Sequence, residues 1–357
     1  MSSAGGNLNI LRLIVALGLW FLVVTAVASY QCWSWLTTPV PIAENQRVVI
    51  IEKGDTLHRL SRRLSGGGML RWPKVWLAYA KFIGATGINA GEYRLAEKES
   101  PVSLLARFQS GDVVQYQITL VEGLTVNDYL RSLHSHKKIK AVLPASPSIE
   151  QWREAGFDFN HPEGWFFPDT YHFSRNSTDV DILQRAYQAM RTTLQDEWQN
   201  RAQNLPYQSA YEALIMASIV EKETGVEFER PDIAGVFVRR LDQNMRLQTD
   251  PTVIYGMGER YQGNITREDL KQPTPYNTYV IKGLPPTPIA MPGRAAIHAA
   301  LHPAGGSALY FVARGDGTHE FSKTLEQHVR AVNKYQKRRR EDYRSSPPPE
   351  EAQQGTL

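Results

Sequence analysis

The longest apolar stretch of the chain lies near its N-terminus. From Leu13 to Ala28 there is no charge and hardly any polar side chain, and the uncharged run continues to Ala43. A stretch of this length can cross a bilayer as one helix. Trp33 and Trp35 follow where an aromatic belt would lie. We therefore predict a transmembrane helix at residues 10–32.

The basic residues around this helix predict its orientation. Arg12 and the amino terminus precede the apolar run, and no basic residue follows it until Arg47. The excess of basic residues before the helix predicts that residues 1–9 are cytoplasmic and that the rest lies outside the cytoplasm. A cleaved signal peptide is the alternative, because Ala26-Val27-Ala28 resembles a cleavage site. In both cases most of the chain functions beyond the inner membrane.

Two related strand-turn-helix patterns follow. Val48 to Ile51 reads as a strand, Gly54-Asp55 as a turn, and Thr56 as the N-cap of a helix with leucines at helical spacing. A similar phrase begins at Tyr116 and leads to an expected N-cap at Thr125. The first pattern resembles the start of a LysM module, a small fold that binds glycans containing N-acetylglucosamine. A generic α+β turn unit is the alternative.

The most apolar segment outside the N-terminal region ends in two acids. Between Ala213 and Val220 only Ser218 is polar, so a helix here must be buried. Glu221 continues an apolar stripe in the expected last turn, before a stop predicted at Gly225. Desolvation and the helix dipole both raise the pKa of a carboxyl there, as a general acid requires. The alternative is a surface acid paired with Lys222 or Arg230. Glu223 is turned about 200° from Glu221 around the helix. For Glu223 we prefer the alternative of a surface acid.

Later segments predict further helices, a hairpin and polar loops. A soft domain boundary is expected between residues 145 and 162. The aromatic group at 165–167 follows it and is either a platform on which sugars stack or, more commonly, part of the hydrophobic core. Helices are expected along 182–198, from Pro231 and along 325–332, and a hairpin around residues 315–317. Residues 245–252 read as a strand end and turn, and 276–279 as a loop.

Composition excludes several classes of protein. The chain has 357 residues, of which 42% are hydrophobic, so it can form real cores. Its net charge of +4 is accounted for by the segment from Lys334 to Arg344, and a basic face for nucleic acid is therefore not expected. Cys32 is the only cysteine, which excludes disulfides within the chain. We predict no metal centre and no cofactor.

Six phrases occur in order along the chain: Glu163-Gly-x-x-x-Pro-Asp-Thr-Tyr171, Ala217-Ser-Ile-Val-Glu-Lys-Glu223, Met245-x-Leu-Gln-x-Asp-Pro-Thr252, Tyr276-Asn-Thr-Tyr279, Gly283-Leu-Pro-Pro286 and His319-x-Phe321. Together they resemble one family, the MltG (YceG-like) endolytic murein transglycosylases. The resemblance implies cleavage of the β-1,4 bond between N-acetylmuramic acid and N-acetylglucosamine within nascent peptidoglycan strands. This cleavage leaves 1,6-anhydro ends and is thought to terminate strand elongation.

The resemblance also implies an α+β architecture with an N-terminal transmembrane helix, a small LysM-like α/β subdomain and a larger mixed α+β catalytic domain. We predict a cytoplasmic N-terminus at 1–9, the helix at 10–32, a linker at 33–46, the LysM-like subdomain region at 47–145, the catalytic domain at 146–335 and a disordered tail at 336–357. The catalytic domain would be periplasmic. The expected partners are peptidoglycan strands, the inner membrane and penicillin-binding synthases, and not nucleic acid.

The family's catalytic glutamate falls on Glu221. Glu223 and Ser218 are predicted to support it, and four further residues are hypothesised to orient sugars: Gln248, Asp250, Tyr276 and Asn277. The chain departs from the family pattern at Thr287, where glycine is usual, and at Val329, where asparagine is usual.

Three alternative functions remain. A muramidase on the same fold would use water as acceptor. A membrane-anchored scaffold would bind glycan and synthases without cleaving. A pyridoxal-dependent lyase would need a lysine in a phosphate pocket, for which we find no pattern in the sequence.

Overall fold

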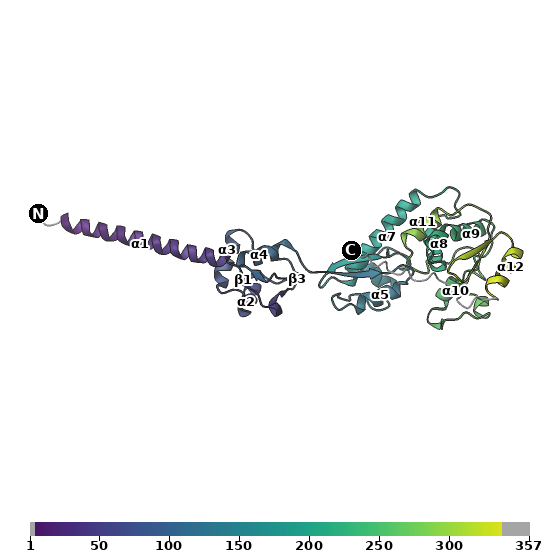
Figure 1. The fold of residues 1–357 in the computed structure, drawn as a ribbon, viewed down its shortest axis with the longest axis horizontal. Coiled ribbons are helices and arrows are strands. Elements are labelled where there is room, and N and C mark those ends of the chain that lie inside the picture. Colours follow the sequence, from purple (N-terminus) through teal and green to yellow (C-terminus); the bar gives the residue numbers. More distant parts are fainter. Residues whose placement is uncertain (1–3, 338–357) are drawn as a thin grey trace. The chain divides into compact units, whose positions relative to one another are not determined.

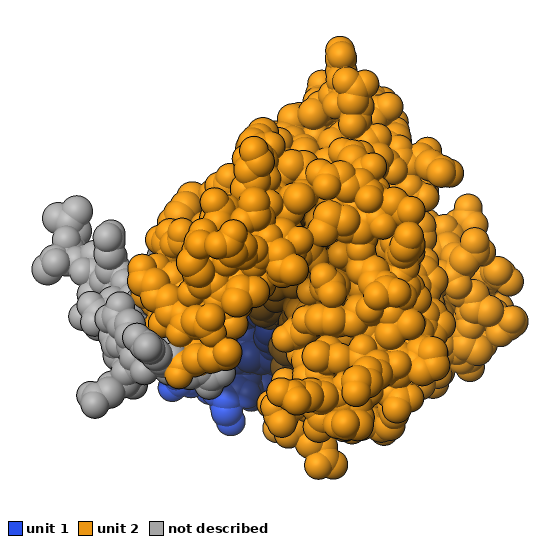
Figure 2. Space-filling model, turned by 90° about the vertical axis from the view of Figure 1, so that its right-hand side faces the viewer, with its two compact units in different colours: residues 1–116, 174–176 blue, residues 117–173, 177–357 orange. Residues whose placement is uncertain are grey.

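The computed structural model describes residues 4–337 and divides into two compact units (Figures 1 and 2). Unit 1 comprises residues 1–116 and 174–176, and unit 2 comprises 117–173 and 177–357. This division differs from the boundary predicted at 145/146, because helix α5 (Val126–Ser135) belongs to unit 2. His134 at the end of α5 contacts Asp179 at 2.9 Å, where α7 (Asp179–Gln199) begins. The predicted tail lies outside the described residues from 338 onward.

The N-terminal apolar run forms one long helix, α1 (Ala4–Thr37). Within the described residues it is the one helix whose length and composition would allow it to cross a membrane, over the 27 residues Leu11–Thr37. The helix ends five residues later than predicted, and the predicted linker at 33–46 is partly structured. Leu36 and Ile42 explain this difference, because both are buried in the core of unit 1.

Unit 1 is built from short strands and helices around that core. Two antiparallel strand pairs, β1 with β4 and β2 with β3, lie beside three helices. The elements are β1 (Val40–Pro41), β2 (Val48–Ile51), α2 (Leu57–Gly66), α3 (Pro73–Phe82), β3 (Gly91–Arg94), β4 (Lys98–Glu99) and α4 (Pro101–Ser110), with a 3-10 helix at Glu44–Gln46. The predicted strand at 48–51 and the helix capped by Thr56 are confirmed.

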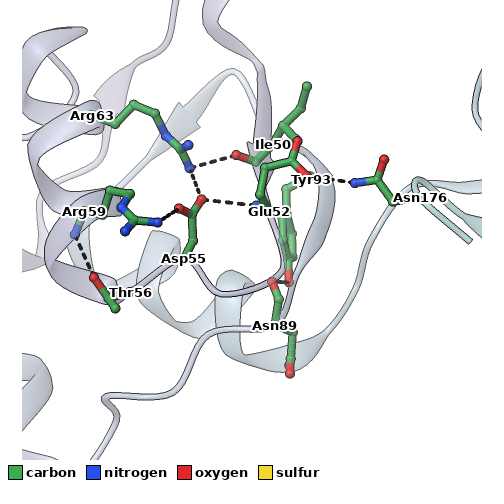
Figure 3. Close-up of polar contacts among 9 residues, drawn as sticks. All are labelled: Ile50, Glu52, Asp55, Thr56, Arg59, Arg63, Asn89, Tyr93 and Asn176. Carbon is green, nitrogen blue, oxygen red and sulfur yellow. Dashed lines mark hydrogen bonds and ion pairs between the residues drawn. The ribbon is translucent and has the colours of Figure 1, made fainter. Parts of the chain in front are cut away.

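The turn of this first strand-turn-helix unit is fixed by Asp55 (Figure 3). Its carboxylate accepts the backbone N–H of Glu52 at 3.1 Å and pairs with Arg59 at 3.1 Å and Arg63 at 3.0 Å. The hydrogen bond from Glu52 and both guanidinium groups lower the pKa of Asp55. Arg63 also donates to the carbonyl of Ile50 at 2.8 Å, so it ties the helix to the strand.

The first part of unit 2 contains the second strand-turn-helix unit. Strand β5 (Gln115–Leu120) pairs with β6 (Asp169–Ser174), and Thr125 caps α5 as predicted. The turn-rich stretch also contains a short helix, α6 (Ile149–Glu154). The aromatic group at 165–167 belongs to the core: Phe166 is fully buried, and its ring centroid lies 5.5 Å from that of Trp152.

The second part of unit 2 packs around α8 (Ala210–Glu223). Every residue from 213 to 220 is buried, which confirms the reading of the apolar run. The helices around it and the predicted hairpin are α9 (Arg230–Asp242), α10 (Asp250–Met257), α11 (Arg294–Leu301), β7 (Tyr310–Ala313), β8 (His319–Ser322) and α12 (Leu325–Tyr335), with 3-10 helices at Glu227–Glu229, Gly258–Arg260 and Asp269–Lys271.

Two local predictions are wrong. Helix α8 ends at Glu223 with Thr224 in the extended conformation, and not with a left-handed Gly225. The Thr224 hydroxyl accepts the N–H of Val226 at 2.9 Å, which stabilises this exit from the helix. Residues 245–252 form no strand end, because Pro251 occupies the first turn of α10, where proline is well tolerated.

Candidate active site

Glu221 lies in the last turn of α8, and its side chain is only 5% exposed. One carboxylate oxygen, Oε2, accepts the backbone N–H of Gly293 at 2.9 Å. The other, Oε1, accepts a hydrogen bond from Nη2 of Arg230 at 3.2 Å. The Arg230 side chain is itself buried, so the carboxyl has a fixed position between a backbone donor and a cation.

The surroundings of Glu221 shift the pKa of its carboxyl in opposite directions. Burial raises the pKa of Glu221, and the nearby Glu122 carboxylate raises it further. The Gly293 N–H and the Arg230 guanidinium lower the pKa, but burial dominates and the net direction is upward. This direction agrees with the one expected from the apolar stripe. The structure also shows that burial and pairing with Arg230 coexist, although the sequence presented them as alternatives.

Two loops pair beside Glu221, and one of them holds the donor Gly293. Gly123 donates its N–H to the carbonyl of Met291, and Met291 donates to the carbonyl of Leu124, both at 2.8 Å. This pairing brings the loop before α5 against the loop before α11. A Cβ at Gly293 would lie 2.2 Å from Oε2 of Glu122, which is the end of a half-exposed side chain that can move aside.

Ser218 connects α8 to the second of these loops. Its hydroxyl donates to the carbonyl of Ile215 at 2.7 Å and accepts the N–H of Ile289 at 3.0 Å. Ser218 is completely buried. Its predicted supporting role gains a physical basis, because the loop it holds continues to Gly293.

Replacing Ser218 by alanine should destabilise the protein by about 1–3 kcal/mol, because the buried N–H of Ile289 would lose its acceptor. Urea unfolding of wild type and variant measures this difference. The exposed Ser146→Ala change is the control and should have little effect. Equal unfolding free energies for Ser218→Ala and wild type would contradict the assigned contact.

Glu223 occupies a different environment from the surface position that we preferred for it. It accepts a hydrogen bond from the hydroxyl of Thr249, whose backbone N–H donates to the hydroxyl of Thr278 at 3.0 Å. Burial raises the pKa of Glu223 to about 7. The preference for a fraying surface acid is therefore wrong. Glu223 instead links the end of α8 to the loop before α10, which agrees with a supporting role.

A cavity of about 1150 Å³ opens beside this helix end. Glu221 does not line it, but its neighbours Lys222 and Gly123 do. Lys222 donates to the carbonyl of Gly123 at 3.0 Å and so joins α8 to the cavity wall. Other lining residues come from α5, α6, the loop before Glu163, α10 and the loop around residue 276, and include Asn127, Arg131, Trp152, His161, Tyr255 and Tyr276.

The sequence analysis overlooked a second buried acid on this wall. Glu163 is 2% exposed and lines the cavity. Its Oε1 accepts the N–H of Val126 at 3.0 Å and its Oε2 accepts the hydroxyl of Tyr255 at 3.0 Å. Burial raises the pKa of Glu163 to about 7. The signal available in the sequence was its position as first residue of the phrase Glu163 to Tyr171, which we used only for the family resemblance.

Glu163 should make stability depend on pH. Its ordinary pKa of 4.5 applies in the unfolded chain, and the folded value is about 7. Between these values the folded state binds more protons, so the free energy of unfolding falls as pH rises, by about 3 kcal/mol from this group. We expect Glu163→Gln to remove that part of the decline, measured by urea unfolding between pH 4.5 and 7.5. An unchanged slope in the variant would contradict this expectation.

Of the four residues hypothesised to orient sugars, only Tyr276 lines the cavity. Its ring centroid lies 5.0 Å from that of Tyr255. Its hydroxyl lies 2.8 Å from the hydroxyl of Thr287, one of the two positions that depart from the family pattern. The other, Val329, is exposed on α12.

The other three hypothesised residues are not among those lining the cavity. Asn277 is 1% exposed, and its amide donates to the carbonyls of Asp269 and Gln272, at 3.1 Å and 2.7 Å. This placement argues against contact with sugar, because the amide stabilises its own loop. Asp250 accepts the Tyr279 hydroxyl at 2.6 Å, and Gln248 has a left-handed backbone with φ 55°. Both are exposed, so their substrate role remains a prediction.

Comparison with known proteins places the chain in a family. The model of the YceG-like family matches residues 49–334. A Bacillus subtilis protein named endolytic murein transglycosylase is 31% identical over 315 residues, which cover 83% of this chain and 87% of that protein. A Streptococcus pneumoniae protein of the same name is 26% identical, and the matched region spans 87% of this chain but only 63% of that longer protein.

Among solved structures, a crystal structure of a yceG-like protein from Listeria monocytogenes is similar. It is 28% identical with a TM-score of 0.48, and the match covers 79% of this chain and 97% of that one. The family match extends over most of the present chain, including both units and all the residues around Glu221. This chain therefore belongs to the YceG-like family.

Proposed function

We propose that this protein is an endolytic murein transglycosylase that cuts the β-1,4 bond between N-acetylmuramic acid and N-acetylglucosamine inside glycan strands. The observation that carries the proposal is the buried carboxyl of Glu221, held by Gly293 and Arg230 with its pKa raised. The Bacillus relative that bears this name supports the substrate class.

A single acid is sufficient for this reaction. Ordinary glycosidases need two carboxylates, because one protonates the leaving group while the other attacks or activates water. In transglycosylation the muramic acid's own 6-hydroxyl is the nucleophile. Protonated Glu221 gives its proton to the glycosidic oxygen as the C1–O bond breaks. The 6-hydroxyl then bonds to C1, and its proton goes to the Glu221 carboxylate, which regenerates the acid.

The neighbours of Glu221 fit both halves of this cycle. Burial favours the protonated form that begins it. Arg230 and the Gly293 N–H stabilise the carboxylate that exists between the two proton transfers. Nε of Arg230 is buried and has no hydrogen-bond partner within the described residues. Proton transfer contributes about 10²–10⁴-fold, and positioning of the sugar must supply the rest.

The remaining parts of the chain suggest where this reaction occurs. Helix α1 would anchor the protein in the inner membrane with residues 1–9 in the cytoplasm, since basic residues precede the apolar run. Unit 2 would then act in the periplasm on nascent strands and end their elongation. The βααβ order in unit 1, β2 to β3, supports a LysM-like glycan-binding role. Penicillin-binding synthases are the partners that such a location would offer.

Product analysis tests this function. The full-length protein in detergent is incubated with purified glycan strands in water enriched in ¹⁸O, and the products are identified by mass spectrometry. We expect internal cuts and unlabelled 1,6-anhydro ends. Reducing ends that carry ¹⁸O would identify a muramidase instead. Strands that are bound but stay intact would favour the membrane-anchored scaffold.

A further inference from the structure

A cluster of two histidines and one glutamate lies on unit 2, apart from the residues around Glu221. His298 is in α11, and His302 caps the C-terminal end of the same helix four residues later. Glu197 comes from the last turn of α7. One potential ligand atom from each of the three residues lies within 4.8 Å of the other two. The prediction of no metal centre overlooked this histidine pair, whose i, i+4 spacing is evident in the sequence.

The geometry of the cluster suits a cation. The two imidazole rings are stacked, with centroids 4.2 Å apart and an interplanar angle of 20°. Nδ1 of His298 lies 2.8 Å from Oε2 of Glu197. The Glu197 side chain is 14% exposed and that of His298 is 57% exposed, so the carboxylate is largely buried while the imidazole beside it faces solvent. Small changes of the histidine rotamers would bring the ligand atoms within range of one ion.

One ring nitrogen of His302 can serve as a ligand. Its Nε2 lies 2.8 Å from the carbonyl oxygen of Asn200, and its Nδ1 lies 3.2 Å from the carbonyl oxygen of His298. A neutral imidazole carries only one hydrogen, so one of its two nitrogens would direct a lone pair at a carbonyl oxygen. A ring that turns away from this carbonyl oxygen can give that lone pair to a metal ion.

The Arg294 guanidinium lies next to the cluster and approaches only one oxygen of the Glu197 carboxylate, which leaves the other oxygen for a metal. Arg294 approaches Oε1 of Glu197, with its Nη1 at 3.4 Å, and its Nη2 lies 3.2 Å from the Thr193 hydroxyl. The oxygen beside His298 is the other one, Oε2. A cation bound there would replace the proton shared by Glu197 and His298, without displacing Arg294.

We propose that Glu197, His298 and His302 form a binding site for a divalent transition-metal cation of the Zn²⁺ class. Imidazole nitrogens with a carboxylate oxygen are ligands that Zn²⁺ prefers, and Mg²⁺ would not select them. The ion would join the C-terminal ends of α7 and α11. Gly293, which donates to Glu221, precedes the opposite end of α11, so the metal stabilises the helix that holds this donor. It takes no part in the glycan reaction.

Metal binding to the full-length protein tests the proposal. Protein without a polyhistidine tag is treated with chelator, dialysed and titrated with ZnCl₂ alone, by calorimetry with metal analysis of the dialysed complex. We expect one Zn²⁺ per chain and a rise in Tm, while MgCl₂ produces neither. His298→Ala and His302→Ala should each weaken binding by about 10-fold or more.

A matched control is His172→Ala, since His172 is also exposed on unit 2 but lies outside the cluster. This variant should bind Zn²⁺ as wild type does. Glu197→Gln keeps the side-chain volume and should weaken binding even if an alanine variant folds poorly, which circular dichroism would reveal. The proposal is overturned if wild type binds no Zn²⁺, or if it binds equally well after both histidines are replaced.

Discussion

Replacing Glu221 by glutamine should lower the rate of glycan cleavage by about 10²–10⁴-fold, the range that general acid-base catalysis contributes. Glutamine has nearly the same shape and its carbonyl oxygen can still accept the Gly293 N–H. It has no acidic proton for the glycosidic oxygen and cannot take the proton of the attacking hydroxyl. Release of anhydro ends from glycan strands, followed by mass spectrometry, measures the loss.

Glu212→Gln is the matched control for this variant, because Glu212 lies in the first turn of the same helix. It should leave cleavage unchanged. Glycan binding by Glu221→Gln should also persist, which separates a lost proton transfer from a lost fold. Full cleavage by Glu221→Gln would contradict its role and favour the scaffold.

Arg230→Met should have the second largest effect. Arg230 is buried, and removal of one partner from a buried ion pair costs about 3–5 kcal/mol. The pKa of Glu221 should rise further, since the guanidinium now lowers it. Because the pKa of Glu221 is raised in the folded variant, the free energy of unfolding falls as the pH rises through that folded-state pKa. The variant should therefore be only slightly destabilised near pH 4.5, where Glu221 is protonated, and strongly destabilised at pH 8.

Urea unfolding across this pH range measures the effect on stability, and the pH-rate profile of cleavage measures the effect on the acid. The alkaline limb of that profile should move to higher pH while the maximal rate falls. Arg330→Met is the control, because Arg330 forms an exposed pair with Glu326 on α12. A destabilisation that is independent of pH would show that Arg230 acts by packing alone.

The central helix and its acid could be predicted because their signal is local. A run of apolar residues from 213 to 220 specifies a buried helix whatever surrounds it, and Glu221 continues that surface. The groups that tune the acid could not be predicted from this pattern. Gly293 is 72 positions away in the chain, and only the pairing of its loop with the loop at Gly123 brings it to the carboxyl.

The surroundings of Asn277 and Glu163 could not be predicted for the same reason. Asn277 was a reasonable sugar ligand by residue type, but its amide is occupied by carbonyls of its own loop. Glu163 was overlooked because its burial depends on Val126 and Tyr255, which come from distant segments. Polar residues in irregular loops carry no periodicity, so their surroundings depend on tertiary contacts. A local pattern cannot separate a binding group from one that stabilises the loop.

The most direct test of this account is a titration of the Glu221 carboxyl itself. The protein is labelled with ¹³C at the glutamate carboxyl carbons, and the Glu221 signal is assigned by its absence in Glu221→Gln. Its chemical shift is then followed with pH. We expect a pKa clearly above the ordinary value of 4.5, since burial outweighs Arg230 and Gly293. A pKa at or below 4.5 would mean that Glu221 is a carboxylate at neutral pH and cannot start the reaction as its acid.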